Sequence, residues 1–307
     1  MTVIIFYVYT NYMNTPQDLK DLRAEKDFFI GIDSDGCVFD SMETKHKECF
    51  CPAFINNFNL QSVSKYARET WDFVNLYSQY RGCNRFHAII KALDLIRDRP
   101  EVQKRTAQIM KLPVTRDWTE RESKLGNPAL KAELDKTNDP ELKIVYQWSS
   151  DVNDAVKKII RGVPPFPLFR ESLDKMRQKA DIIVVSQTPT ETLVREWAEL
   201  NLDSLVRFIA GQELGTKAEH LSYAAKGKYA ADKILMIGDA PGDLKAAQTA
   251  EVLFYPIVPG REDESWKRFH DEALEKFFNL NYKGAYQESL LNEFNKSLPE
   301  KAPWIKA

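Results

Sequence analysis

The stretch FFIGIDSDGCVFDSM, residues Phe28 to Met42, joins a short apolar run to two acidic residues. Residues 28–32 predict a short buried strand, and Asp33, Asp35 and Gly36 follow directly where that strand ends. In an open parallel sheet, ligands bind beyond the carboxyl ends of the strands. Asp33 and Asp35 are therefore expected at the edge where a substrate and a metal ion would meet.

Strands and helices alternate again from about residue 164 onward. The segments DIIVVS (181–186), RFIAG (207–211), KILMIGD (233–239) and VLFYPIV (252–258) predict buried strands, and amphipathic segments predict a helix between each pair. Such alternation is typical of βαβ units with right-handed crossovers. The fold class predicted is α/β, a Rossmann-like doubly wound parallel sheet.

Residues 43–163 interrupt this pattern with helical periodicity and no convincing strand. An insertion of that length is expected to form a domain of its own, because structureless loops so long are improbable. We therefore predict an inserted α-helical cap domain (43–163) over the carboxyl edge of the sheet. Residues 28–42 and 164–307 form the core with C-terminal helices, and residues 1–27 form an N-terminal tail or helix.

Polar residues recur at the predicted strand ends. Ser186 follows the second strand, Lys217 lies beyond the third, and Asp239 and Asp243 follow the fourth in the sequence GDAPGD. Each alone has a simpler explanation: Asp-Gly suits a turn, and a serine after a strand often caps a helix. An ordered set at four strand ends is much harder to obtain by chance, and it indicates a catalytic site.

This ordered set resembles the four motifs of the haloacid dehalogenase-like (HAD) hydrolase superfamily, in its helical-cap subfamily. The motifs correspond to Asp33-Ser34-Asp35, Ser186, Lys217 and Gly238 to Asp243. Lys226 and Lys228 compete with Lys217 for the third motif. The dehalogenases of that superfamily lack the second acid and the metal, so the resemblance implies phosphoryl transfer. The sequence Gln187-Thr188-Pro189 departs from the small polar residues often found after the second motif.

The chemistry of phosphate esters supports the same assignment. An anionic ester needs positive charge around it and a positioned nucleophile. Asp33 is the predicted nucleophile, Asp35 the acid and base, Ser186 a donor to the phosphoryl oxygens and Lys217 a counter-charge. Mg²⁺ is the predicted cofactor. Its predicted ligands are Asp33, Asp35, Asp239 and Asp243, and the backbone N–H groups near Gly36 and Thr188 are expected to complete the phosphate cradle.

In the predicted cap, Arg81 and Arg85 are candidates for binding a second anionic group, although an exposed ion-pairing face explains them as well. Trp71, Tyr77 and Tyr80 are expected to form the cap core.

Composition sets wider limits. The chain has 307 residues, a net charge of −2 and four cysteines. This balance favours neither nucleic acid nor an anionic membrane as a partner, and few cysteines fit a reducing, cytoplasmic setting. Zinc is disfavoured because no second ligand pair follows Cys49 and Cys51. The first twelve residues lack the features of a signal peptide.

The sequence as a whole predicts a Mg²⁺-dependent phosphatase for a small phosphorylated metabolite, acting through an aspartyl-phosphate as a monomer or homodimer. Two alternatives stay open. A phosphomutase of the same fold would isomerise a sugar phosphate, and a non-catalytic binding protein would keep the fold without turnover.

Overall fold

The computed structural model describes residues 15–305, so the predictions for the first twelve residues lie outside it. The chain divides into two compact units. We call residues 15–40 and 162–294 the α/β unit, and residues 41–161 and 295–305 the helical unit. None of the helices within residues 15–305 has the length and apolar character that crossing a bilayer requires.

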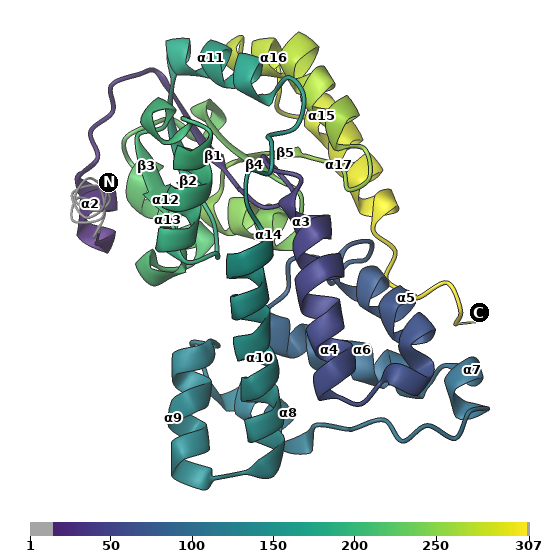
Figure 1. Cartoon of the computed structure of the whole chain (residues 1–307). Coiled ribbons are helices and arrows are strands. Elements are labelled where there is room, and N and C mark those ends of the chain that lie inside the picture. The colour runs from purple at the N-terminus through teal and green to yellow at the C-terminus, as the bar shows by residue number, and fades with distance from the viewer. Residues whose placement is uncertain (1–14, 306–307) are drawn as a thin grey trace. The chain divides into compact units, whose positions relative to one another are not determined.

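The α/β unit contains a five-stranded parallel sheet in the order β3-β2-β1-β4-β5 (Figure 1). The strands are β1 (Phe28–Ile32), β2 (Ala180–Val185), β3 (Phe208–Ala210), β4 (Ile234–Gly238) and β5 (Leu253–Pro256). Every strand residue is buried, as expected for a parallel sheet covered on both faces. The predicted α/β fold class is confirmed.

Register places the predicted site residues at one edge. Ile32, the last residue of β1, pairs with Val184 of β2 and with Ile237 of β4. The chain therefore leaves β1 at Asp33 between the ends of its two neighbours, which lead into Ser186 and Asp239.

Four helices connect the strands after β1, as the alternation predicts. They are α11 (Phe169–Lys179), α12 (Thr190–Glu199), α13 (Lys217–Ala225) and α14 (Pro241–Ala250). Helix α13 ends at Ala225, and Gly227 adopts a positive φ of 77° just beyond its end. Short turns η3 (Asp203–Leu205), η4 (Gln212–Leu214) and η5 (Ala231–Lys233) complete the connections, and α2 (Pro16–Asp21) precedes the sheet.

Helices cover both faces of the sheet. One face packs against α11, α12 and the C-terminal helices in a core that includes Ile30, Phe169, Trp197 and Trp266. The other face packs against α13 and α14: a Cβ added to Gly31 of β1 would lie 2.7 Å from Leu221 of α13. The sheet is therefore the middle of three layers, as in doubly wound folds.

The first C-terminal helical stretch runs through α15 (Glu262–Arg268), η6 (Phe269–Ala273) and α16 (Leu274–Phe278), and α17 (Ala285–Ser297) follows. The predicted C-terminal helices are thus present.

The helical unit has no strand among residues 41–161 and 295–305. Its chain begins with α3 (Ser41–Thr44), η1 (Lys45–Phe50), α4 (Cys51–Asn57) and η2 (Gln61–Val63). It continues with α5 (Ser64–Asn75), α6 (Arg85–Arg97), α7 (Pro100–Gln103), α8 (Pro113–Arg121), α9 (Asn127–Thr137) and α10 (Pro140–Ile159). Trp71, Trp118 and Trp148 are fully buried in its core, and Tyr80 packs against this core partly buried. Tyr77 is half-buried, and its hydroxyl donates to Glu43.

The last residues that the structure describes return to the helical unit. Pro299 accepts a hydrogen bond from the N–H of Gln79 at 3.3 Å, and Ala302 is 2% exposed in this unit's core. The predicted division had assigned the whole tail to the α/β core. Residues 295–305 instead group with the helical unit, because Ala302 and Trp304 find their apolar partners there.

Candidate active site

Asp33 is held at the carboxyl end of β1. Its backbone N–H donates to the carbonyl of Ile237 at 2.9 Å, and the residue is 5% exposed. Two buried indoles fix the loop that follows: Trp197 Nε1 donates to Ser34 Oγ at 3.0 Å and Trp266 Nε1 donates to the carbonyl of Cys37 at 2.8 Å. The loop is therefore a rigid support for both acids of the Asp33-Ser34-Asp35 pair.

Lys217 is the lysine that reaches Asp33. It is the first residue of α13, after the N-cap Thr216, whose hydroxyl accepts from the N–H of Glu219. Its Nζ lies 2.8 Å from Asp33 Oδ1 and 2.6 Å from Asp243 Oδ1. Lys226 pairs instead with Glu251 at 3.6 Å, and the ammonium of Lys228 donates to backbone carbonyls. Geometry thus separates the three candidate lysines.

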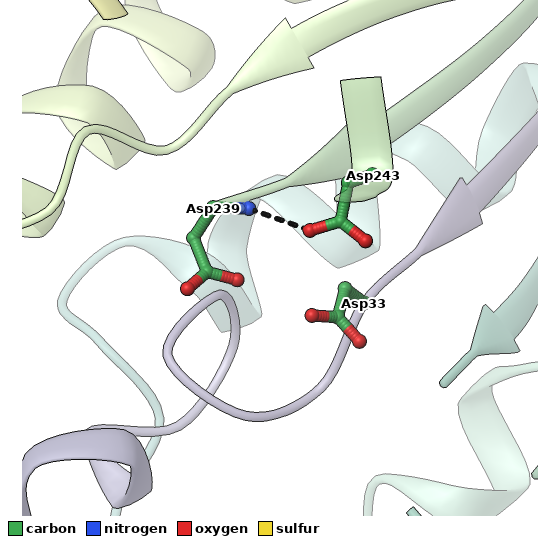
Figure 2. Close-up of side chains that lie close together, drawn as sticks. All are labelled: Asp33, Asp239 and Asp243. Carbon is green, nitrogen blue, oxygen red and sulfur yellow. Dashed lines mark hydrogen bonds between the residues drawn. The ribbon is translucent and has the colours of Figure 1, made fainter. Parts of the chain in front are cut away.

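Asp239 and Asp243 are joined by the start of α14. Asp243 Oδ2 accepts hydrogen bonds from the N–H groups of Asp239 at 3.1 Å and Ala240 at 3.0 Å, and Figure 2 shows the first of these. Asp243 thus binds the loop before its own helix on one side and Lys217 on the other. Because both of its carboxylate oxygens are used in this way, Asp243 is suited to positioning the Asp239 loop and Lys217.

The carboxylates of Asp33, Asp239 and Asp243 form a compact buried cluster (Figure 2). One ligand oxygen from each lies within 4.8 Å of the others. Three carboxylates face one ammonium, so the cluster carries excess negative charge when all are ionised. Hard oxygen donors at this spacing fit a small divalent cation such as Mg²⁺.

The pKa values of both Asp33 and Lys217 are raised in this cluster. Burial raises the pKa of Asp33 above 3.8; Lys217 opposes this, and the carboxylates of Asp243 and Asp239 add to it. Burial opposes the charge on Lys217, but Asp243 and Asp33 outweigh it and raise the pKa of this lysine. Lys217 is therefore a permanent cation beside Asp33.

Asp35 and Ser186 are linked through Thr188. The Thr188 hydroxyl donates to Asp35 Oδ2 at 2.9 Å, and the Thr188 N–H donates to Ser186 Oγ at 3.2 Å. Ser186 Oγ acts as an acceptor in this contact, so its own proton is left to donate to another group. The carboxylate of Asp35 is not part of the three-acid cluster found within residues 15–305.

The N–H groups at the two positions named for the backbone cradle already have partners, and the cradle around them stays a prediction. The N–H of Gly36 donates to the carbonyl of Phe39 at 2.9 Å, and the N–H of Thr188 is used by Ser186. Both donors serve to shape their own loops. Sequence reasoning placed them by proximity to the strand ends and had no information on the path of each loop.

Arg81 and Arg85 belong to the helical unit and have partners there. Arg81 is 3% exposed, and its guanidinium donates to the carbonyl of Leu76 at 2.9 Å. Arg85 donates to Asn153 Oδ1 at 2.8 Å and to Ser149 Oγ at 3.1 Å, with its guanidinium 5.0 Å from the ring of Phe50. Neither forms the exposed ion-pairing face considered above, and their role in binding a second anion stays a prediction.

Sequence reasoning named Thr188 only for its backbone N–H and Gly238 only as part of a motif, and it missed the two indole donors. A Cβ added to Gly238 would lie 2.4 Å from the Cβ of Asp243, so glycine is required there. The unusual Gln187-Thr188-Pro189 segment was the only signal that set the Thr188 side chain apart. Trp197 and Trp266 have the spacing of ordinary core residues, which concealed their hydrogen bonds.

Comparison with protein families gives a match to a model described as haloacid dehalogenase-like hydrolase over residues 102–257, about half of the chain. This range contains Ser186, Lys217, Asp239 and Asp243, whereas Asp33 and Asp35 lie before it. No curated protein compared with the chain matches it.

Several solved structures are similar to the chain at low sequence identity. A predicted phosphoglycolate phosphatase from Haemophilus somnus is 14% identical, with 76% of this chain and 86% of that chain covered and a TM-score of 0.45. A HAD-superfamily hydrolase of subfamily IA from Geobacter sulfurreducens is 16% identical, with 76% and 89% covered and a TM-score of 0.39. A haloacid dehalogenase-like family protein from Streptococcus pneumoniae is 11% identical, with 78% and 90% covered and a TM-score of 0.44.

Proposed function

Because this chain belongs to the haloacid dehalogenase-like hydrolase family, we propose that it is a Mg²⁺-dependent phosphatase of small phosphorylated metabolites, with Asp33 as the nucleophile. The observation that carries the proposal is the contact of Lys217 with both Asp33 and Asp243, at 2.8 and 2.6 Å, beside a third buried carboxylate. A nucleophile, a fixed cation and a metal-type acid cluster thus occupy one edge of the sheet.

The first half of the reaction is phosphoryl transfer to the protein. Lys217 lies against Oδ1 of Asp33, so Oδ2 would attack phosphorus. A bond forms between this oxygen and phosphorus while the bond to the ester oxygen breaks. The leaving alcohol takes its proton from Asp35, and the Ser186 hydroxyl donates to a phosphoryl oxygen.

Hydrolysis of the aspartyl-phosphate completes the cycle. Water attacks phosphorus and gives a proton to Asp35, which the first half-reaction left ionised. The bond between phosphorus and Asp33 breaks, inorganic phosphate leaves, and the Asp33 carboxylate is restored. Asp35 therefore serves as acid and then as base.

The buried acid cluster supports a divalent metal. Asp33 and Asp239 would supply carboxylate ligands, with Asp243 positioning both the Asp239 loop and Lys217. Bound Mg²⁺ would supply positive charge that stabilises the phosphoryl oxygens. The earlier prediction that Asp35 also ligates the metal remains a prediction, since its carboxylate bonds to Thr188.

A panel of sugar phosphates, nucleotides and phosphorylated acids tests the proposal. Wild-type protein is expected to release inorganic phosphate from at least one of them with Mg²⁺ present. Chelation removes the metal ion, and Asp33→Asn removes the nucleophile. Either change should lower the rate at least about a thousandfold. Asp263→Asn, at an exposed acid in α15, is the control that should retain full activity.

The panel separates this proposal from its alternatives. Release of phosphate by chelated protein and by Asp33→Asn at wild-type rates would overturn the mechanism. An isomerised sugar phosphate without free phosphate would indicate a mutase. Magnesium binding with no turnover on any ester would indicate a binding protein.

A further inference from the structure

We propose that Thr188 is a positioning residue for the acid and base Asp35, an inference that rests on the proposed function. The Thr188 hydroxyl donates to Asp35 Oδ2 at 2.9 Å, from the loop after β2 to the loop after β1. No family pattern quoted above requires this threonine, since the segment Gln187-Thr188-Pro189 departs from the usual residues.

The backbone of Thr188 is fixed on both sides, so its hydroxyl has a defined position. Its N–H donates to Ser186 Oγ at 3.2 Å, and its carbonyl accepts from the N–H of Gln212 at 3.2 Å. Pro189 follows as the N-cap of α12 with φ of −55°, close to the only value a proline ring allows. Little rotation is left in the chain around Thr188.

The loop after β3 supports the same position. Glu213 Oε2 accepts from the N–H and hydroxyl of Thr190 at 3.0 and 2.8 Å, and Gln187 Nε2 donates to the carbonyl of Gly215 at 3.0 Å. Gly211 makes the close approach possible, because a Cβ there would lie 2.7 Å from the Thr188 carbonyl. The loops carrying Ser186 and Lys217 are thus bonded together, with Thr188 facing Asp35.

The hydrogen bond from Thr188 is expected to affect proton transfer by Asp35 and not phosphate binding. Asp35 follows Asp33 by two residues and precedes Gly36, which has a positive φ of 75°, so its carboxylate projects from a tight turn. A hydrogen bond from a fixed donor restricts the rotation of that carboxylate. General acid catalysis requires the acid within hydrogen-bond reach of the leaving oxygen, so loss of the donor should slow only reactions that need this proton.

The role of Thr188 can be tested by comparing kcat/KM on substrates whose leaving groups differ in their need for a proton. The expelled p-nitrophenolate of p-nitrophenyl phosphate needs no proton, whereas an alkoxide leaving group does. For a reaction through an aspartyl-phosphate, kcat/KM reports the first half-reaction alone. The experiment compares kcat/KM of wild type, Thr188→Val and Thr188→Ser on p-nitrophenyl phosphate and on an alkyl phosphate from the panel.

Thr188→Val should lower kcat/KM on the alkyl phosphate about tenfold or more, a part of the usual contribution of general acid catalysis. On p-nitrophenyl phosphate its kcat/KM should stay within about twofold of wild type, and Thr188→Ser should restore the alkyl rate because it keeps the donor. In an Asp35→Asn background, Thr188→Val should cause no further loss.

Equal losses on both substrates, no loss on either, or an additive loss in the Asp35→Asn background would overturn the inference while the phosphatase proposal stands. Wild-type protein without turnover on any ester of the panel would overturn the proposed function, and this inference with it. A thermal unfolding curve for Thr188→Val shows whether this variant is folded. If it is not, kcat/KM of Thr188→Ala on the same two substrates is compared with wild type, and the same pattern of losses decides.

Discussion

Gly238 lies so close to Asp243 that a side chain at position 238 would overlap it. An added Cβ would be 2.4 Å from the Cβ of Asp243 and 2.6 Å from its Oδ2. Asp243 is fully buried, and its two oxygens bond to Lys217 and to two backbone N–H groups. The absence of a side chain at the end of β4 therefore leaves room for a carboxylate that Lys217 contacts.

Gly238→Ala should disrupt the site without removing any of its functional groups. Asp243 must move, so we expect a loss of about 2 kcal/mol in the free energy of unfolding, typical of overpacking. Phosphatase activity should fall at least about a hundredfold, because Lys217 loses a partner. Thermal unfolding and phosphate release measure the two effects.

Gly242→Ala is the matched control for this change. It lies in the first turn of α14, and apart from its chain neighbours and the nearby backbone of its own helix no atom stands within 4 Å of an added Cβ there. Because alanine favours a helix over glycine, this variant should be at least as stable as wild type and equally active. Similar losses in both variants would show that the overlap at Gly238 is not the cause.

Lys217→Gln tests whether the cation beside Asp33 takes part in the reaction. The change removes the only ammonium found within 3 Å of Asp33 in the described chain, so kcat should fall about a hundredfold or more. Lys226→Gln, at a lysine whose side chain is 65% exposed, should leave kcat unchanged. Unaltered kcat in Lys217→Gln, or an equal loss in Lys226→Gln, would contradict this role.

The strands and the acids that end them were predictable from the sequence. Buried parallel strands are continuous apolar runs, so Phe28–Ile32 and Ile234–Gly238 stand out from their polar surroundings. A polar residue directly after such a run must lie at the sheet edge, which is how Asp33 and Asp239 were located. The order of the strands then brings these acidic residues together at one edge of the sheet.

Contacts between loops were not predictable, because they depend on the path of each loop. The bond between Thr188 and Asp35 joins residues 153 positions apart, and neither residue has periodicity that signals the other. Sequence alone did not decide between Lys217 and Lys226, since both lie in the segment predicted to form the helix between the third and fourth strands. Only the N-terminal position of Lys217 on α13 brings its ammonium to Asp33.

A second polar cluster, far from the strand ends just described, links stability to pH. Asp181, 3% exposed at the start of β2, accepts from the Tyr229 hydroxyl at 2.6 Å, from Arg207 at 2.9 Å and from the N–H groups of Glu25 and Lys26 at 2.8 and 3.0 Å. Burial opposes ionisation, but these hydrogen bonds together lower the pKa of Asp181 below 3.8.

Asp181→Asn should therefore destabilise the protein in a pH-dependent way. A carboxyl group with a lowered pKa contributes stability that is fully present above its unfolded value of 3.8 and is lost as pH falls through the folded value. We expect the variant to lose about 2 kcal/mol at pH 7, the scale of a hydrogen bond to a charged group. The difference from wild type should shrink near pH 3.

Urea unfolding at both pH values measures this difference. Asp232→Asn, at an exposed acid before β4, should show no comparable loss at pH 7. A penalty for Asp181→Asn that is the same at pH 7 and near pH 3 would mean that ionisation of Asp181 does not contribute to stability.

Trp304 should stabilise the helical unit although only three residues follow it in the sequence. The Arg99 guanidinium lies 4.1 Å from the ring centroid of Trp304, and the ring of Phe73 packs edge-on at 5.6 Å. Arg99 is 5% exposed and pairs with Glu69, so this cation is largely removed from water. Cation–π and aromatic contacts of this kind contribute about 2 kcal/mol together.

Trp304→Ala should accordingly lower the stability of the helical unit by about 2 kcal/mol, because both contacts are lost together. Trp304→Phe should retain most of it because it keeps an aromatic face for Arg99. Ile305→Ala, at a side chain 46% exposed, is the neighbouring control and should have little effect. Amide hydrogen exchange in α5 and α6 is the measurement, since it reports this unit separately from the sheet. Unchanged protection in α5 and α6 of Trp304→Ala would show that the C-terminal segment packs there without stabilising the unit.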